Sequence, residues 1–301
     1  MAVSADRMTT TPRRWREALD RADPQDLALR LTLLYFVLEP GIHWQERVPV
    51  QALAAAALLV PGWLQSRGIW GLLAAVNAFR LLYLWPHADN HDYFATYWCL
   101  AIFVTRWAPD VPAALARSAR LLLGCGFALA LLWKAVLSPD FLNGDFFRLA
   151  LLMDGRFPDL ARLAGGLSLA LQEGNARFLA GQGGVFVEPP ALVFLAGVMT
   201  TWTLAVEALL AVVFLWPDGS RPGPLLSGLR DGLLILFCAS TFAVAPVAGF
   251  GWLLVAMGVA QCGPGRTRVR GFYLATFLII LVYASVPWLE LLADAFQGGQ
   301  G

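Results

Sequence analysis

The most regular feature of this chain is a succession of apolar segments of roughly 17 to 25 residues, separated by short polar or glycine- and proline-containing stretches. A segment of this length can cross the hydrocarbon of a bilayer as an α-helix, which satisfies its own backbone hydrogen bonds. The apolar residues do not alternate with period two, which disfavours a β-barrel. The pattern therefore predicts an all-α, polytopic integral membrane bundle of about nine transmembrane helices. The predicted helices cover residues 27–45, 49–65, 68–85, 92–107, 113–137, 191–216, 226–246, 249–263 and 271–292.

Composition supports a membrane location. Of the 301 residues, 58% are hydrophobic and 14% are charged, which is too much apolar surface for a water-soluble fold of this size. The net charge is only +1 and the arginines are scattered, so no basic stripe for nucleic acid is present in the sequence. We expect membrane lipid as the main partner, and no nucleic acid.

The arginines also predict the orientation of the helices. Cytoplasmic loops are enriched in arginine and lysine, and one alternating arrangement puts most arginines near loops on one side. This arrangement places the N-terminus inside and the C-terminus outside, in the plasma (inner) membrane of a bacterial type of cell. We accordingly expect a cytosolic tail over residues 1–26, a single membrane domain over 27–292 and a short outer tail over 293–301.

A long segment between the fifth and sixth predicted helices, residues 138–190, falls on the outer side. It mixes acidic and basic residues with leucine, phenylalanine and glycine, which is typical of an amphipathic segment lying on a membrane or capping a bundle. We predict one or two short helices over 157–179 and a loop over 181–190.

Lys134 is the only lysine of the chain and lies near the outer end of the fifth predicted helix. A partly buried lysine, unlike an arginine, can lose its proton near neutral pH and act as a base. The alternative is an amine that extends to the membrane interface while its stem stays in the apolar layer. Spacing alone does not choose between these two interpretations.

All three histidines, His43, His87 and His91, fall on the outer side in this arrangement. His87 and His91 are four residues apart and would share a face of a helix, so they could bind a metal or exchange protons. The competing interpretation is a simple turn in which Asp89 or Asn90 caps the fourth helix.

Glu39 and Glu207 lie within apolar stretches of predicted membrane helices, where such groups usually face the bundle interior and have a partner. Glu39 lies near the outer end of the first helix, four residues before His43. Glu207 lies near the middle of the sixth helix, and the sequence favours Arg80 as its charged partner.

Two short motifs resemble those of a known family. Residues 89–94 read DNHDYF at the start of a membrane helix and are similar to the Asn-His-x-Tyr-Leu element of the horizontally transferred transmembrane family, whose relatives include vitamin K-dependent γ-glutamyl carboxylases. Lys134 followed by residues 140–144, DFLNG, resembles that family's lysine and Asp-Trp-Leu-x-Gly element. The spacing between Lys134 and Asp140 is two residues longer than the family's usual spacing.

The resemblance implies a site that faces the outer side and accepts a reduced quinone, or another small lipid-soluble molecule, as cofactor or substrate. In the carboxylases the matching lysine is the base that deprotonates the quinol, which here is Lys134, and the matching histidine, here His91, assists it. The groups expected to position the substrate are Asp89, Asn90, Asp140 and Glu39. A quinol-dependent carboxylase-like or oxidoreductase-like enzyme follows from this resemblance, whereas carboxylation of a protein glutamate is not expected, because no soluble peptide-presenting region follows the last predicted helix.

Three other functions stay open at this stage. A transporter or lipid-binding protein would line a path with Glu39, Arg80 and Glu207. A metal site would use His43, His87 and His91. The chain could also be a structural subunit of a larger membrane assembly.

Overall fold

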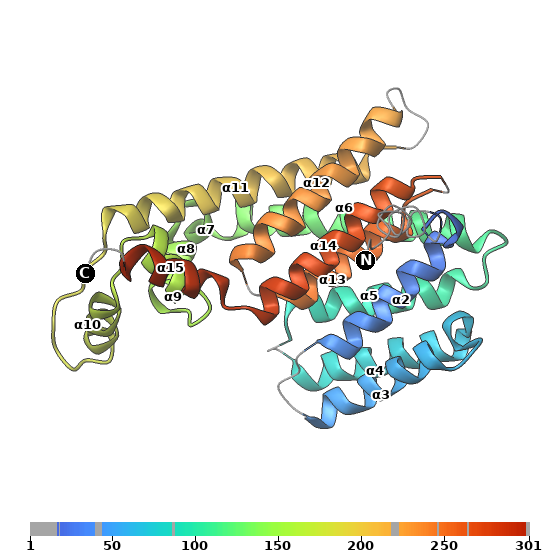
Figure 1. Cartoon of the computed structure of the whole chain (residues 1–301), viewed down its shortest axis with the longest axis horizontal. Coiled ribbons are helices and arrows are strands. Elements are labelled where there is room, and N and C mark those ends of the chain that lie inside the picture. The colour runs from blue at the N-terminus through green and yellow to red at the C-terminus, as the bar shows by residue number, and fades with distance from the viewer. Residues whose placement is uncertain are drawn as a thin grey trace, which may run out of the picture.

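A computed structural model describes residues 17, 19–39, 44–85, 88–217, 223–245, 247–263 and 265–298. Within these ranges helices are the only regular secondary structure, so the all-α prediction is confirmed for this part of the chain (Figure 1). Each predicted membrane segment contains a helix. These helices are α2 (Pro24–Leu38), α3 (Trp44–Leu59), α4 (Arg67–Leu84), α5 (Asn90–Thr105), α6 (Val111–Leu132), α11 (Pro190–Leu215), α12 (Gly223–Val244), α13 (Ala248–Ala260) and α14 (Thr267–Ser285).

Among the residues that the structure describes, four stretches of helix are long and apolar enough to cross a membrane: Val111–Leu137, Pro190–Leu215, Leu225–Val244 and Thr267–Ser285. The other main helices are either shorter or more polar. The prediction for 271–292 was too long, because α14 ends at Ser285 and a separate helix, α15 (Trp288–Gly298), follows Pro287. Part of the predicted C-terminal tail over 293–301 is therefore helical.

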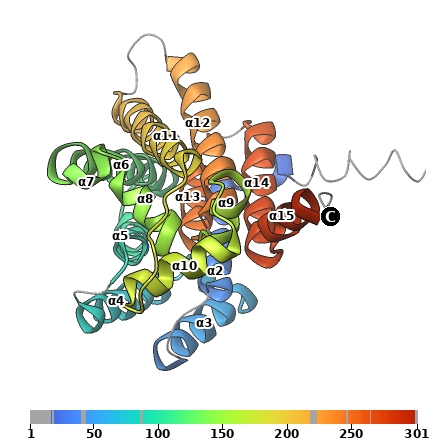
Figure 2. The same cartoon turned by 90° about the vertical axis from the view of Figure 1, so that its left-hand side faces the viewer.

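The short helix α13 lies at the centre of the bundle, as the end-on view in Figure 2 shows. It packs against α2, α5, α6, α12 and α14, and nearly all of its residues from Gly249 to Ala260 are buried. A helix that is apolar on every side suits a position that water does not reach, which neighbouring helices provide for α13. Glycine permits close packing here, because a Cβ atom on Gly258 would lie 2.5 Å from the ring of Tyr273 in α14.

The segment between α6 and α11 folds into short helices at one end of the molecule. Its elements are the π-helical turn η2 (Trp133–Leu137), α7 (Pro139–Leu142), α8 (Asp145–Met153), α9 (Pro158–Ala164) and α10 (Leu169–Leu179). One further short element, the 3₁₀ helix η1 (Trp63–Gln65), lies between α3 and α4. The prediction of one or two short helices over 157–179 is confirmed by α9 and α10. Helices α8, α9, α10 and α15 gather at the left-hand end of Figure 1, around a small apolar core that includes Leu151, Leu160 and Leu192.

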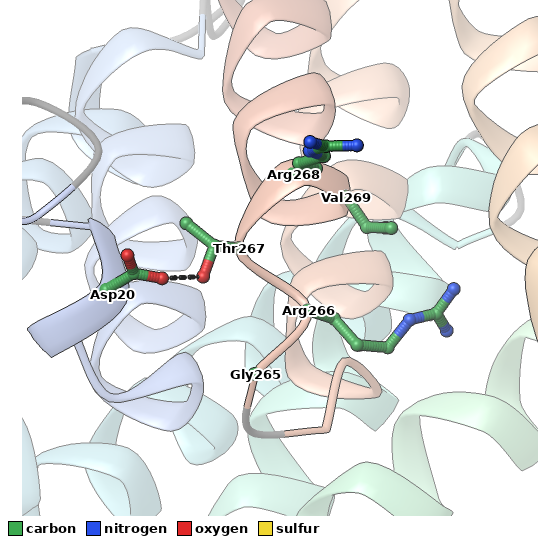
Figure 3. A pocket seen from close by; sticks show the side chains of 6 residues that line it. All are labelled: Asp20, Gly265, Arg266, Thr267, Arg268 and Val269. Carbon is green, nitrogen blue, oxygen red and sulfur yellow. Dashed lines mark hydrogen bonds between the residues drawn. The ribbon is translucent and has the colours of Figure 1, made fainter. Parts of the chain in front are cut away.

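The end of the predicted N-terminal tail packs against the start of α14. Figure 3 shows Asp20 hydrogen-bonded to the Thr267 hydroxyl beside a pocket that the first turn of α14 lines. Arg270, which is 1% exposed, donates a hydrogen bond of 2.5 Å to the backbone carbonyl of Ala22. These contacts tie the last residues before α2 to the same end of the bundle as the arginines of α14.

Candidate functional site

Lys134 forms an ion pair with Glu207, whose side chain is buried in the helical bundle. The Lys134 ammonium donates a hydrogen bond to Glu207 Oε1. The side chain of Glu207 is 6% exposed and that of Lys134 is 24% exposed. Glu207 Oε2 is buried without a hydrogen-bond partner, and such an unsatisfied oxygen is costly unless another group binds it. The pair therefore has a free acceptor directly beside a lysine that has two further donor hydrogens.

The backbone around Lys134 departs from the α-helix. Helix α6 passes at Trp133 into the π-helical turn η2, which ends at Leu137. One-turn π-helical segments inside membrane or soluble helices are rare and occur frequently at functional sites. The ammonium also lies 5.3 Å from the centre of the Phe141 ring in α7, at a distance that allows a cation–π contact. Lys134 is thus held between a carboxylate of α11 and an aromatic ring.

His91 belongs to a different group of side chains, where the end of α2 meets the start of α5. His91 Nε2 lies 3.2 Å from Glu39 Oε1. Next to it, Arg80 of α4 contacts Asp92 Oδ1 at 3.3 Å. Glu39 and Asp92 are each 7% exposed. We call Glu39, Arg80, His91 and Asp92 the histidine cluster.

Local structure explains how these side chains are placed. Asp89 is the N-cap of α5, and its side chain and that of Asp92 form a reciprocal capping box. The Asp89 backbone N–H donates to Asp92 Oδ2 over 3.2 Å. This cap holds His91 and Asp92 in the first turn of α5. Of the two capping residues considered from the sequence, Asp89 or Asn90, the structure has Asp89 as the cap.

Tyr35 and Gly249 complete the surroundings of Glu39. A Cβ atom on Gly249 of α13 would lie 3.3 Å from both Glu39 Oε1 and the Tyr35 ring. The Tyr35 side chain is fully buried, and its hydroxyl lies beside Glu39 without a hydrogen bond of normal geometry. Glycine at position 249 therefore leaves room for the close approach of the central helix to the cluster, and a side chain there would require Glu39 or Tyr35 to shift slightly.

A row of phenylalanine rings lies between the histidine cluster and the Lys134–Glu207 ion pair. Rings of Phe94, Phe250, Phe242, Phe237 and Phe127 follow one another with centroid separations of 5.2 to 6.1 Å. This row leads from α5, one turn after His91, to α6, two turns before Lys134. Phenylalanine rings cannot carry protons. Along this row of rings, the histidine cluster and the Lys134–Glu207 pair are therefore separate polar sites.

Several predictions about partners are corrected by this geometry. The expected pairing of Glu207 with Arg80 is wrong, because Glu207 bonds Lys134 and Arg80 contacts Asp92. Asp140 is exposed, and Lys134 uses Glu207 as its carboxylate partner. The pairing of Glu207 with Lys134 was not predicted from the sequence.

The other predicted residues are distributed as follows. Asp89 and Asn90 are exposed at the start of α5. His43 and His87, two members of the predicted three-histidine metal site, lie outside the described residues. Asp92 was not singled out from the sequence, although its position three residues after Asp89 is the signature of a capping box.

Outside the membrane-spanning helices, the segment between α6 and α11 is held by an Arg148–Glu188 ion pair. Arg148 Nε donates to Glu188 Oε1 over 2.7 Å and an Arg148 terminal nitrogen donates to Oε2 over 2.6 Å. These two hydrogen bonds hold the pKa of Glu188 below its usual value. The pair fastens α8 to the chain just before α11.

Comparison of the chain with protein-family models, with curated proteins and with solved structures yields no match.

Proposed function

We propose that the chain is a multi-pass protein of the inner membrane, with about nine crossings, its N-terminus inside and its C-terminus outside. Contacts between helix ends support this arrangement. Arg106 at the end of α5 bonds Gln65 between α3 and α4, and Gln65 bonds Asp26 at the start of α2. At the other ends, Glu39 after α2 meets His91 at the start of α5. Helix ends assigned to the same side by the arginine pattern are therefore neighbours.

We further propose that the chain acts on a quinol, or a similar lipid-soluble molecule with an acidic hydroxyl, with Lys134 as the base. This follows the resemblance to the carboxylase-like family, and the observation that carries it is the partly buried Lys134–Glu207 pair, in which one Glu207 oxygen has no hydrogen-bond partner. A quinol would supply the hydroxyl proton and the electrons of any later oxidation.

The chemistry assigned to the chain itself is a proton transfer. When the proton shared by the pair resides on Glu207, the Lys134 amine is free to take the proton of the substrate hydroxyl. The resulting ammonium then pairs with the oxyanion that it has created, in surroundings where such a pair is stronger than in water. Glu207 Oε2 is an acceptor that can hold the hydroxyl before transfer.

Access from the lipid is consistent with this proposal. Trp133, Val136 and Leu137, which surround Lys134 in η2, are between 58% and 66% exposed. Apolar side chains on the outside of a membrane helix contact lipid tails, so a molecule dissolved in the bilayer can reach η2 laterally. The expected proton-partner role of His91 is not part of this step, because His91 pairs with Glu39.

The test uses the full chain in liposomes that contain a reduced naphthoquinone, with oxygen consumption as the readout. Lys134→Arg keeps the positive charge but cannot serve as a base near neutral pH. We expect it to lower quinol-dependent oxygen consumption by about a hundredfold or more, the usual contribution of a general base. Arg177→Lys, at an exposed position of α10, is the matched control and should behave as the wild type. Equal rates in Lys134→Arg and the wild type, or no quinol-dependent rate in the wild type, would contradict the proposal.

A further inference from the structure

The histidine cluster contains three metal-ligating side chains from two helix ends. Glu39 at the end of α2, and His91 and Asp92 in the first turn of α5, each present one ligand atom, and these atoms all lie within 4.8 Å of one another. The three-histidine site considered from the sequence used a different set of residues. Only His91 is common to both.

We propose that Glu39, His91 and Asp92 bind a divalent transition-metal ion of the zinc type. The spacing of the first two ligands fits such an ion. Two atoms bonded to zinc at about 2.0 Å in tetrahedral geometry are about 3.3 Å apart, and Glu39 Oε1 and His91 Nε2 are separated by 3.2 Å. Asp92 would complete the set by a small rotation of its carboxylate.

The second observation concerns two buried oxygens at this place whose hydrogen bonding is incomplete. Asp92 Oδ1 contacts Arg80 at 3.3 Å but makes no hydrogen bond of normal geometry, and the hydroxyl of the fully buried Tyr35 lies beside Glu39. Buried oxygens of this kind are normally bonded to protein, water or an ion. An ion held by Glu39 would lie within reach of both Asp92 and the neighbouring phenol.

The charges of the cluster also favour a cation. Two carboxylates, Glu39 and Asp92, face one guanidinium, that of Arg80, while the imidazole of His91 is neutral as a metal ligand. The cluster then has a net negative charge, which a divalent ion with one bound hydroxide or anion would balance. Arg80 would remain on the outer side of the Asp92 carboxylate and orient it, as groups hydrogen-bonded to metal ligands commonly do.

The ligand types select the class of ion. Mg²⁺ and Ca²⁺ prefer oxygen ligands alone, whereas an imidazole nitrogen favours zinc and its neighbours in the transition series. Three protein ligands leave one tetrahedral position for water or an anion. Because the ligands come from α2 and α5 and contact α13 through Gly249, a bound ion would also fasten these three helices together.

Zinc binding to the purified full chain tests the proposal. The protein is prepared with a histidine-free affinity tag, stripped with a chelator, saturated with zinc chloride and gel-filtered, and its zinc content is measured by mass spectrometry. We expect one zinc ion per chain in the wild type. Zinc should bind at least tenfold more weakly to Glu39→Gln and His91→Phe, because each removes one ligand. Glu173→Gln, which changes an exposed acid of α10, is the control and should keep wild-type affinity.

Asp92→Asn distinguishes loss of a zinc ligand from loss of the fold. The amide oxygen of asparagine can still accept the hydrogen bond from the Asp89 backbone, so the cap of α5 is kept while one ligand charge is lost. Less than about a tenth of a zinc ion per wild-type chain, or unchanged affinity in a correctly folded Asp92→Asn protein, would overturn the proposal. Lys134→Arg should retain its zinc, so loss of quinol chemistry and loss of the metal site are distinguishable.

Discussion

Replacing Lys134 with methionine should destabilise the protein through the carboxylate that it leaves behind. Methionine keeps much of the length of the lysine stem but removes the charged group that bonds Glu207. The Glu207 side chain is 6% exposed and already has one oxygen without a partner. Removing one member of a fully buried ion pair costs about 3 to 5 kcal/mol, and since Lys134 is 24% exposed we expect about 2 to 3 kcal/mol.

The magnitude can be measured by a double-mutant cycle of Lys134→Met, Glu207→Gln and the combined variant. Thermal unfolding in detergent, followed by the fluorescence of the 12 tryptophans, reports each change. With about 2 to 4 °C per kcal/mol for a chain of this order of size, Lys134→Met should lower Tm by about 4 to 12 °C. The double variant should lose less than the sum of the two single variants, because no unpaired buried charge remains in it.

The control for this cycle is Arg177→Met, which removes a positive charge from an exposed position and should change Tm little. If the effects of Lys134→Met and Glu207→Gln add within about 0.5 kcal/mol, the two side chains are not coupled. That result would refute the assignment of Glu207 as the partner of Lys134.

Two further predictions concern positions away from the candidate site. Glu188→Gln should lower the stability of the protein at pH 7, because Arg148 lowers the pKa of Glu188 and so stabilises the folded state above the usual pKa of about 4.5. The stability difference between wild type and variant should shrink as the pH falls below this value and the carboxylate is protonated; a difference that grows in acid would contradict the reasoning. Gly258→Ala should destabilise by about 1 to 3 kcal/mol, because the new methyl group would meet the buried Tyr273 ring at 2.5 Å. Gly228→Ala, which has open space around it, is the control in the same Tm measurement, and equal effects at the two positions would exclude the close approach as the cause.

The positions of the helices were readable from the sequence where apolar runs were long and their ends carried a turn signal. Helices α6, α11 and α12 begin and end within a few residues of the predicted ranges. The end of α14 was less predictable, because the apolar residues continue beyond Ser285 and only Pro287 marks the break.

The two polar centres were only partly predictable. His91 and Lys134 stood out by residue type and by the motifs around them, and Asp89 by its capping position. Their partners did not stand out. Glu39 and His91 are more than 50 positions apart in the chain and Lys134 and Glu207 are 73 apart, so no local spacing relates them.

The sequence by itself determined that this protein is helical and apolar enough for a membrane, because helix length and hydropathy are properties of contiguous residues. Only the tertiary structure decided that Lys134 pairs with Glu207 and that His91 pairs with Glu39. The physical reason is that these pairs depend on how each helix is rotated about its axis and which helix lies beside it. Both are set by packing around the buried helix α13, where glycines such as Gly249 and Gly258 allow neighbouring side chains to approach the backbone.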